Sequence, residues 1–460
     1  MGRGRARFGR EGRLTYLQEL ARFACGARLA DLPGKVFSRA RWLIADSLPV
    51  IAAGMQLPEL QALSARHLAG AAPGPAWVLG ARRRASAMDA ALLNGTAGTA
   101  LELNEGNLYA KGHPGIQVVP AAVALAQEIA ASGEALLMAA VVGYEVGSRI
   151  SRAAQMKISV HPHGTWGTLC AAVAAGRLKR FDERQMLELI NVATTMGMAT
   201  SRQTLLDGAT VRNIFTGHAG YMGLMAARLV ECGFTGERDS PAAIYGKVLS
   251  DGFDPAKAVE NLGSEWLLGV GYFKLHPTGR YVHSVIDALE DLLSRSGKLD
   301  IGSIERVEVK AYRLAAMLAE KHVTSSFGAR FSVPFALATI LHHGGSGLAQ
   351  FEQAAVDNAA IQALAARVDV QEDESYSARY PAEQRCDLRI VLAGGQVLEG
   401  RCTVTKGEPS KPHEPAALEA KFMQLGGPLW GEEQARRLLA GCLKLEEIPD
   451  FSSFAQGFDL

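Results

Sequence analysis

Apolar residues recur every three to four positions through most of the first 267 residues of the chain. This spacing predicts a succession of helices. Several of them are apolar on almost all sides, as in residues 135–143, and such helices lie inside a large bundle rather than on its surface. The predicted helices of this part cover residues 37–53, 86–101, 118–131, 134–154, 167–180, 183–198, 217–232 and 255–262.

The pattern changes after Gly269. Apolar and polar residues alternate over 304–311, 367–371, 386–392 and 397–404, which is typical of half-buried strands, and residues 393–396 form a hairpin turn between the last two. Helices are predicted at 281–295 and 332–341. Helical spacing then returns at 415–425 and 432–443. The predicted fold is mostly α, with an all-helical domain built from residues 14–270 and 407–460 and an α+β domain inserted at 271–406.

Composition narrows the class of protein. A chain of 460 residues exceeds what one hydrophobic core usually supports, which also favours two domains. The 48 basic and 47 acidic residues leave a net charge of +1, which argues against a nucleic-acid partner. No apolar stretch reaches the ~20 residues that cross a bilayer, so we expect no membrane partner.

Terminal and cysteine patterns favour the cytoplasm. Residues 1–13 carry five arginines among glycines without an apolar core, so this segment is predicted to be a basic tail and not a signal peptide. The six cysteines form no C-x-x-C pair and are too dispersed for an iron–sulfur cluster. Unpaired cysteines of this kind are typical of a reducing cytoplasm.

Candidate chemistry centres on three short histidine segments, residues 112–115, 161–165 and 274–278. Each places a titratable ring beside proline and glycine or threonine, in loops that a rigid scaffold can hold. Histidine changes its charge near neutral pH, so these segments predict acid–base chemistry. No phosphate-binding glycine loop, Gly-x-Ser-x-Gly or His-Glu-x-x-His occurs, and we therefore expect neither nucleotide nor metal. The four candidate rings are His113, His161, His163 and His276.

Two charged residues interrupt apolar stretches. Lys274 lies between Phe273 and Leu275, where burial or nearby cations would lower its pKa toward neutrality, although a solvated lysine is the alternative. Arg212 lies just before an apolar helix and could bind a carboxylate through its planar guanidinium, or could be a surface charge. Arg280 is a second candidate for binding a carboxylate.

An acceptor-rich run precedes His113 along the chain. Its polar members could orient His113 or bind a substrate. The alternative is that the run is a helix C-terminus capped at Gly106. The polar members are Glu102, Asn104, Glu105 and Asn107.

In their order and spacing these segments resemble the MmgE/PrpD family, whose members include 2-methylcitrate dehydratase, cis-aconitate decarboxylase and iminodisuccinate epimerase. The resemblance implies a large helical domain, a smaller α+β lid, and a cleft between them that holds a small polycarboxylate. It also implies a homodimer without metal or organic cofactor, and site positions at His113, His161 and Lys274. The segments that carry it are 46–47, 94–97, 112–114, 161–167, 273–277 and 330–335.

Three positions depart from the family pattern. Residues 102–106 replace a more acidic run, Arg212 stands where many members have lysine, and Phe335 stands where tyrosine is frequent. Arginine does not carry protons at neutral pH, because its pKa exceeds 12. Arg212 is therefore expected to bind and neutralise a carboxylate.

These observations predict an enzyme that removes a proton next to a carboxylate. His161 and Lys274 are the expected acid–base pair, with His113 as a further donor and Arg212 and Arg280 as carboxylate ligands. Dehydration is the leading reaction, followed by epimerisation and then decarboxylation. An inactive homologue that binds a metabolite is the non-enzyme alternative. The other expected substrate contacts are Glu102, Asn104, Glu105, Asn107, His163 and His276.

Overall fold

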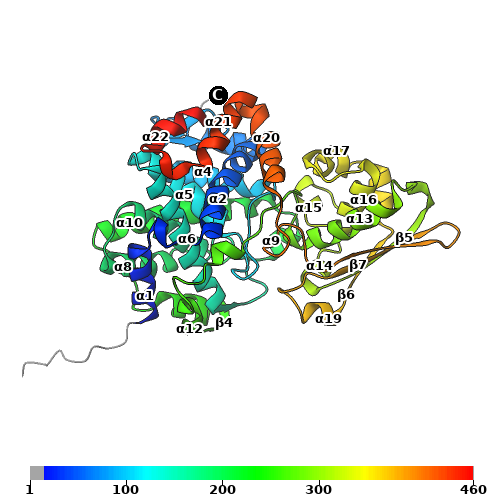
Figure 1. Ribbon diagram of the computed structural model, residues 1–460, viewed down its shortest axis with the longest axis horizontal. Coiled ribbons are helices and arrows are strands. Elements are labelled where there is room, and N and C mark those ends of the chain that lie inside the picture. Colours follow the sequence, from blue (N-terminus) through cyan, green and yellow to red (C-terminus); the bar gives the residue numbers. More distant parts are fainter. Residues whose placement is uncertain (1–14, 459–460) are drawn as a thin grey trace, which may run out of the picture.

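The larger part of the molecule is a helical domain built around five helices that bury most of their surface (Figure 1). The computed structural model describes residues 15–458. Helix α7 packs against α5, α6 and α10, and α4 packs against α5 and α10. These helices approach closely because their contacts are made by small residues: a Cβ at Gly95 would lie 2.9 Å from the Cα of Gly217. The five are α4 (Ala87–Ala100), α5 (Pro114–Glu128), α6 (Gly133–Ala153), α7 (Gly167–Leu178) and α10 (Ile214–Glu231).

Shorter elements surround these five helices. Side-chain caps fix where several helices begin, such as the reciprocal capping of Thr15 and Gln18 at the start of α1. The peripheral helices are α1 (Tyr16–Gly26), α2 (Gly34–Gly54), α3 (Pro58–His67), α8 (Glu183–Thr195), α9 (Gln203–Leu206), α11 (Ser240–Ala243) and α12 (Pro255–Val259). Two small antiparallel pairs join β1 (Ala76–Val78) to β2 (Arg83–Ala85) and β3 (Ala154–Met156) to β4 (Ser250–Phe253).

The smaller domain contains a four-stranded sheet in the order β6-β5-β7-β8. Strand β5 pairs in parallel with β6 and antiparallel with β7, which pairs antiparallel with β8. Gly394 and Gly395 both have positive φ in the β7–β8 turn, as the predicted hairpin requires. The strands are β5 (Ile304–Ala311), β6 (Val368–Glu372), β7 (Cys386–Leu392) and β8 (Val397–Cys402).

Helices cover one face of this sheet, while charged side chains occupy the other. Helix α13 (His283–Ser296) packs on β7 and β8, and α16 (Val333–His343) contacts α13 and β6. Gly400 allows α13 to approach, since a Cβ there would meet the carbonyl oxygen of Ala288 at 2.1 Å. The remaining helices of this domain are α14 (Arg313–Ala316), α15 (Ser326–Ala329), α17 (Gln353–Val356), α18 (Ala359–Ala365) and α19 (Glu374–Ser377).

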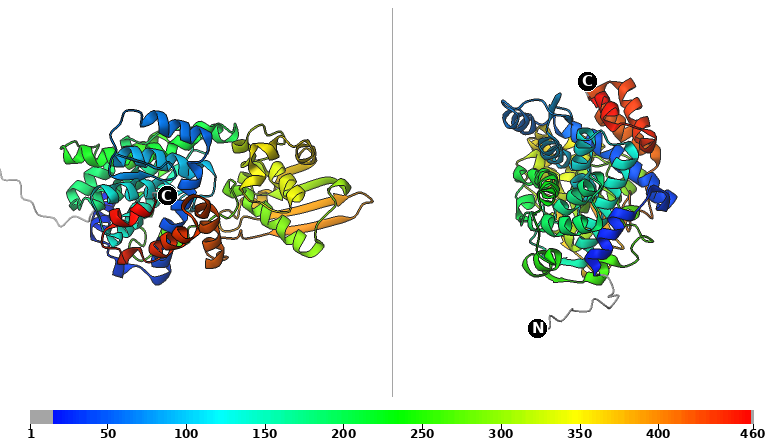
Figure 2. Two further views of the ribbon diagram at one scale, coloured as in Figure 1. Left: turned by 90° about the horizontal axis from the view of Figure 1, so that it is seen from above. Right: turned by 90° about the vertical axis from the view of Figure 1, so that its left-hand side faces the viewer.

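The last helices return to the helical domain, as Figure 2 shows. Helix α20 (Pro415–Trp430) packs on α2 and on α21 (Glu432–Cys442), and α22 (Phe451–Phe454) contacts α5. The buried Lys421 ammonium contacts Asp46 at 2.6 Å and donates to the Leu103 carbonyl at 2.7 Å. The fold class expected from the pattern is thus confirmed: a large helical domain carries a smaller α+β domain.

The described residues do not test every expectation from the sequence. The division of the chain at residues 270 and 406 stays a proposal. The basic tail at residues 1–13 and the first residue of the expected helical domain, residue 14, lie outside the described residues. Within the described part of the chain, no helix is both long and apolar enough to cross a membrane.

Candidate active site

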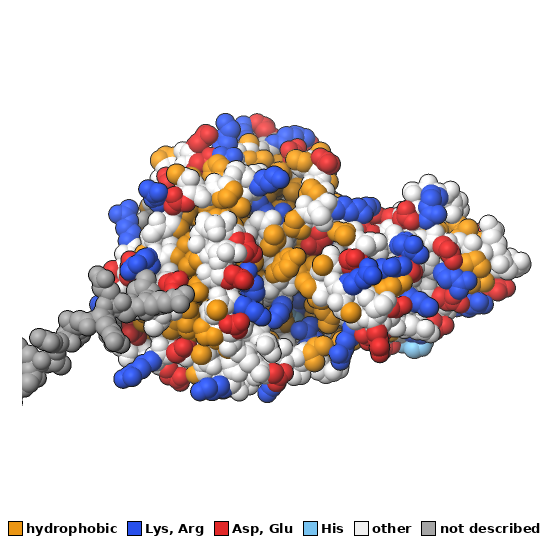
Figure 3. Space-filling model, turned by 60° about the horizontal axis from the view of Figure 1, so that its bottom comes forward, with side chains coloured by type: hydrophobic (Ala, Val, Ile, Leu, Met, Phe, Trp, Pro, Cys, Tyr) orange, Lys and Arg blue, Asp and Glu red, His pale blue; other side chains and the backbone are white. Residues whose placement is uncertain are grey.

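A cavity lies where the two domains meet, and both contribute to its wall. It contains about 720 Å³ of empty space, including its mouth, which is open to solvent. Basic side chains gather at this junction in the space-filling view (Figure 3). The polar residues of the wall are Glu102, Asn107, Lys111, His113, His161, His163, Arg202, Arg212, Tyr272, Arg280, Tyr281 and Tyr380.

Three histidine rings from two loops meet at this cavity. His113 directly precedes α5, whose first residue is Pro114, while His161 and His163 lie in the loop between β3 and α7. The His163 ring stands edge-on to both others, with centroids 5.0 Å from His113 and 4.7 Å from His161. Gly164 follows with φ +79°, a conformation that favours glycine, and so turns the chain behind the pair. The structure thus brings the first two histidine segments together at one cavity.

Hydrogen bonds and burial set the protonation of these rings. His113 Nδ1 lies 2.7 Å from the carbonyl oxygen of Glu105, so it donates its proton there and leaves the lone pair on Nε2. His161 Nδ1 accepts from the backbone N–H of His163 at 3.1 Å. Burial, reinforced by Lys274, lowers the pKa of His113 to about 3, and burial with the Arg212 charge lowers the pKa of His161 and His163 well below normal. All three rings are therefore neutral at physiological pH.

His163 differs from the other two rings in its hydrogen bonding. Its side chain is fully buried, and neither ring nitrogen has a hydrogen-bond partner among the described residues. An unsatisfied buried polar group costs about 1–3 kcal/mol, which a bound ligand would recover. The ring borders the cavity, so His163 is available to a ligand on either nitrogen.

Glu102 connects two of the expected site residues. It follows α4 in a left-handed conformation with φ +54°, which directs its carboxylate between Arg212, at 2.7 Å, and Lys274, at 3.2 Å. Burial alone would raise its pKa, but the charges of Arg212 and Lys274 prevail and lower the pKa to about 2. Glu102 is thus a fixed carboxylate and cannot serve as a base near neutral pH.

Lys274 is fully buried behind Glu102, which excludes the solvated alternative. Its ammonium donates to the backbone and side-chain oxygens of Glu102, at 2.9 and 3.2 Å, and to the Thr278 carbonyl at 3.4 Å. Burial, together with the Arg212 charge, outweighs Glu102 and lowers the pKa of Lys274 to about 8. The cavity wall itself is formed by Glu102 rather than by Lys274.

The two arginines have different surroundings. Arg212 is 1% exposed, which excludes the surface-charge alternative, and its Nε lies 3.4 Å from Nε2 of His161. Arg280 also borders the cavity, but it pairs with Glu408 at 2.5 Å and stacks over the Tyr272 ring at 4.1 Å. Arg212 therefore adjoins the histidine cluster, while Arg280 is held by Glu408 and Tyr272.

The acceptor-rich run before His113 mostly holds neighbouring groups in place through hydrogen bonds. Glu105 accepts from Tyr144 at 2.6 Å and from the Gly115 N–H at 3.0 Å, and its backbone carbonyl orients His113. Asn107 borders the cavity with its side chain bonded to Tyr144, Leu267 and Ala110. The amide of Asn104 reaches the Glu105 carbonyl at 3.4 Å.

The helix-cap alternative for this run is wrong. Helix α4 already ends at Ala100. Gly106 instead pairs with Tyr272 through two backbone hydrogen bonds of 3.0 and 2.7 Å. This backbone bridge connects the acceptor-rich run directly to the segment that carries Lys274.

His276 lies apart from the other histidines, with Nδ1 2.6 Å from Ser346 Oγ. Its ring, Asp287 and Glu290 bring possible metal-ligand atoms within 4.8 Å of one another. The Lys406 ammonium already pairs with Glu290 at 2.6 Å, however, and its backbone N–H donates to Asp287 at 2.6 Å. These contacts already supply positive charge and a hydrogen bond to the two carboxylates.

Several cavity residues were not predicted from the sequence. Tyr272, Tyr281 and Tyr380 bring hydroxyl groups to the wall, and Lys111 and Arg202 add positive charge. Phe335 instead packs against Phe351 in the core of the smaller domain, with ring centroids 6.1 Å apart. No local signal identifies the three tyrosines, because the fold alone brings 272, 281 and 380 together.

The wall has a marked excess of positive charge. Among the described residues that form it, four are basic and Glu102 is acidic, while the three histidines are neutral. The basic four are Lys111, Arg202, Arg212 and Arg280. Such a cavity attracts a small anion with more than one negative charge.

Comparison with known families covers both domains. Residues 18–256 match the MmgE/PrpD N-terminal domain, and residues 276–446 match the MmgE/PrpD C-terminal domain. The chain belongs to the MmgE/PrpD family. The resemblance drawn from the histidine segments is thereby confirmed, and an enzyme role is supported at the level of the family.

Relatives within the family match over almost their full length. A cis-aconitate decarboxylase of Aspergillus terreus is 24% identical over 465 residues, covering 94% of each chain. The cis-aconitate decarboxylase-like protein oryM of Aspergillus oryzae is 24% identical over 477 residues, covering 96% of each chain. This MmgE/PrpD chain is thus similar to lyases throughout both domains, whereas its homodimeric state stays a prediction.

Proposed function

We propose that the chain is an MmgE/PrpD lyase that removes a proton next to a carboxylate of a small di- or tricarboxylate. The observation that carries this proposal is the meeting of three neutral histidines with an excess of cations in one cavity. Neutral imidazoles can accept and return protons, and the cations stabilise the negative charge that develops on the substrate.

His113 is the proposed base. Its Nδ1 proton is held by the Glu105 carbonyl, so the lone pair on Nε2 is the basic one. Burial and the nearby Lys274 charge lower the pKa of His113. A bound polycarboxylate brings opposite charge close to the ring and raises that pKa toward the range in which a base is effective.

Proton donation is assigned to the remaining groups of the wall. His161 and His163 stand next to His113, and Tyr272 offers a hydroxyl on the same wall. Lys274 is proposed as a positioning residue, because its ammonium is directed at three oxygen acceptors and fixes Glu102. Arg212 is proposed to bind a substrate carboxylate beside His161.

Dehydration is the leading reaction within this proposal. Loss of the α-proton to His113, with a proton delivered to the departing hydroxyl, yields an alkene and water. His163 is the proposed donor once substrate is bound: the polycarboxylate raises its pKa, as it does that of His113, so the ring can carry a proton, and both of its ring nitrogens lack a partner among the described residues. Phe335 lies in the core of the smaller domain, outside the cavity wall, so its lack of a hydroxyl does not bear on the choice between dehydration and epimerisation.

Decarboxylation is the second candidate. The relatives bear the name cis-aconitate decarboxylase, and they match both domains of this chain. In that reaction a carboxylate leaves as carbon dioxide, and the carbon that retains the electron pair takes a proton from the wall. The same histidines would supply that proton, so the reaction is decided by the substrate and its orientation.

The deciding experiment incubates the enzyme with C4 to C7 polycarboxylates in deuterated water and follows the products by NMR. An alkene with loss of hydroxyl supports dehydration, release of carbon dioxide supports decarboxylation, and inversion at the labelled carbon shows epimerisation. A metabolite-binding homologue without activity would leave every compound unchanged, with no deuterium taken up from the water. That last outcome would overturn the proposal.

A matched pair of variants tests the base. His113→Gln should lower kcat by a factor of about 10²–10⁴, which is the usual contribution of general acid–base catalysis. His343→Gln is the control, since this exposed histidine lies at the end of α16. Equal activity of the two variants would remove His113 from the mechanism.

A further inference from the structure

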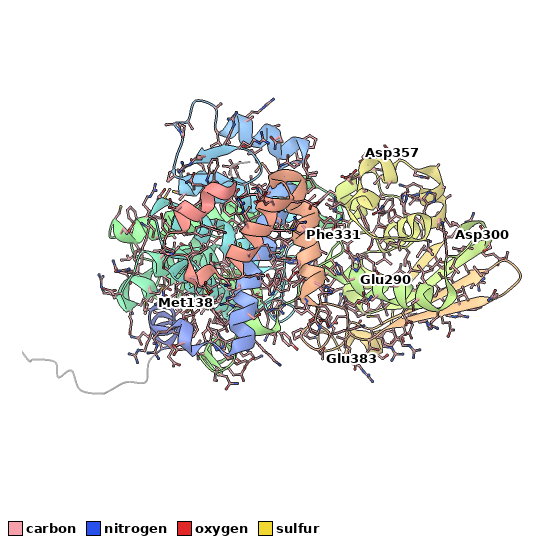
Figure 4. The ribbon with its side chains drawn as sticks, turned by 45° about the horizontal axis from the view of Figure 1, so that its top comes forward. Met138, Glu290, Asp300, Phe331, Asp357 and Glu383 are labelled. Carbon is pink, nitrogen blue, oxygen red and sulfur yellow. The ribbon has the colours of Figure 1, made fainter. Side chains whose placement is uncertain are left out.

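The cavity has an apolar wall that a polycarboxylate alone leaves uncovered. Figure 4 shows Phe331 on the side of the smaller domain that faces the helical domain. Eight apolar side chains line the cavity, of which Leu108 and Pro162 adjoin the site segments along the chain. The other six, from both domains, form the apolar wall. They are Leu205, Leu206, Leu314, Met317, Leu318 and Phe331.

We propose that the substrate carries, beside its carboxylates, an alkyl group of several carbons that packs against these six side chains. The inference rests on the function proposed above, because the carboxylates must bind at the histidine end of the same cavity. Carboxylates pair with Arg212 and the other cations, while the alkyl group covers the leucine, methionine and phenylalanine side chains.

Four of the six side chains are partly exposed, whereas Leu318 and Phe331 are buried at 4% and 5% exposed. Leu205 and Leu206 of α9 pack against the core of the smaller domain, yet both stay partly exposed, as does Leu314. Met317 is 40% exposed although it borders the cavity. Core residues of the same domain, such as Val285 and Leu289, are 0% exposed. Apolar surface left open to water is unfavourable, and an alkyl group of the ligand would bury it.

The extent of the wall indicates the size of the group. A single methyl group has too little surface to contact six side chains that come from the α9 segment, the α14 segment and the loop after α15. A chain of about three to six carbons is long enough to reach along such a wall, since each further methylene adds its own buried surface. The six apolar side chains carry no charge of their own, so they favour an alkyl group over a further carboxylate.

The test is a series of substrates that differ only in the alkyl group on the carbon bearing the carboxylate: hydrogen, methyl, propyl, butyl and hexyl. We expect kcat/KM to rise about fourfold per methylene through the first members, as burial of a methylene predicts. Equal values across the series, or a steady decline beyond hydrogen, would overturn the inference.

Variants locate the effect on the wall. Met317→Asn should remove most of the gain between the methyl and butyl members, because a polar amide replaces the thioether surface. Val397→Asn is the matched control: this valine is 39% exposed on β8, outside the cavity wall, and its replacement should preserve the full gain. Loss of the gain in both variants would contradict a role for the wall.

Failure of the inference and failure of the proposed function give different results. If unsubstituted substrates turn over as fast as the alkyl series, the inference is wrong while the function stands. If no member of the series exchanges deuterium, the function is wrong. Calorimetric affinities for alkyl-substituted succinates then still test the wall, since affinity that does not increase with chain length would overturn the inference by itself.

Discussion

The pairing of Glu102 with two buried cations determines how each residue around it can act. A carboxylate with a pKa near 2 is an acceptor at any pH at which the protein functions, and it keeps Arg212 and Lys274 in place. The three histidines and the Tyr272 hydroxyl then remain on the cavity wall as the groups proposed to exchange protons. Arg212, which touches both Glu102 and the histidine cluster, is the residue whose replacement is most informative.

Arg212→Lys should raise KM about tenfold and change kcat less. The guanidinium reaches Glu102 through Nη1 and His161 through Nε at once, whereas a lysine ammonium is a single point of charge. A tenfold effect corresponds to about 1.4 kcal/mol of lost carboxylate binding. Steady-state kinetics check this, with Arg436→Lys on the exposed face of α21 as control. An unchanged KM would show that Arg212 binds no substrate carboxylate.

Glu105 predicts a specific dependence of stability on pH. Burial raises its pKa from 4.5 to about 7, although Tyr144, Arg39 and Gly115 oppose the rise. The folded protein therefore binds this proton more tightly than the unfolded chain does. The contribution to stability is fully present below pH 4.5 and is lost as pH rises to 7, and it amounts to about 3 kcal/mol in total.

Urea unfolding at pH 5, 6 and 7 measures this effect. Glu105→Gln should flatten the fall of the unfolding free energy over that interval relative to the unmodified protein. Glu433→Gln is the control, since its side chain is 81% exposed on α21. Parallel pH profiles for Glu105→Gln and the unmodified protein would show that Glu105 titrates normally.

At the level of elements, long periodic segments were predictable and short irregular ones were not. Strand 304–311 is predictable because buried and exposed residues alternate along it. Helix 167–180 is predictable because apolar residues recur on almost all of its sides. Helix α9 has four residues and α14 has four, too few for a period to show. The left-handed turn at Glu102 depends on its two cationic partners, which lie more than a hundred residues further along the chain.

The contact between α2 and α20 gives a prediction at this scale. Lys421→Met leaves the buried Asp46 carboxylate without its cation and should cost about 3–5 kcal/mol of folding free energy. Lys444→Met, which removes a pair whose side chains are 68% and 63% exposed, should cost about 0–1 kcal/mol. Urea unfolding of the two variants compares these costs. Similar values would mean that Asp46 and Lys421 do not act as a buried pair.

For the whole molecule, the sequence indicated which polar residues carry the candidate chemistry, but not how the two domains complete the cavity around them. His113, His161, His163 and Arg212 were predicted as site residues, and the fold brings all four to one cavity. The segments of the three histidines carry proline and glycine, which mark loops that hold polar groups. The tyrosines and the apolar wall come from segments without such marks, because only the packing of one domain on the other makes them neighbours.

The cavity between the two domains gives a prediction at the scale of the whole molecule. Because His163 and Arg212 line it from the helical domain and Tyr281 lines it from the smaller one, a polycarboxylate bound in this cavity is expected to contact both domains. It should therefore slow hydrogen exchange in the loop at 161–165, in residues 271–282 and in α14 together. Acetate at equal carboxylate concentration is the control, since one carboxylate cannot reach across both domains. Protection confined to 161–165 would show that the ligand binds the helical domain alone, and the smaller domain would then play no part in holding the substrate.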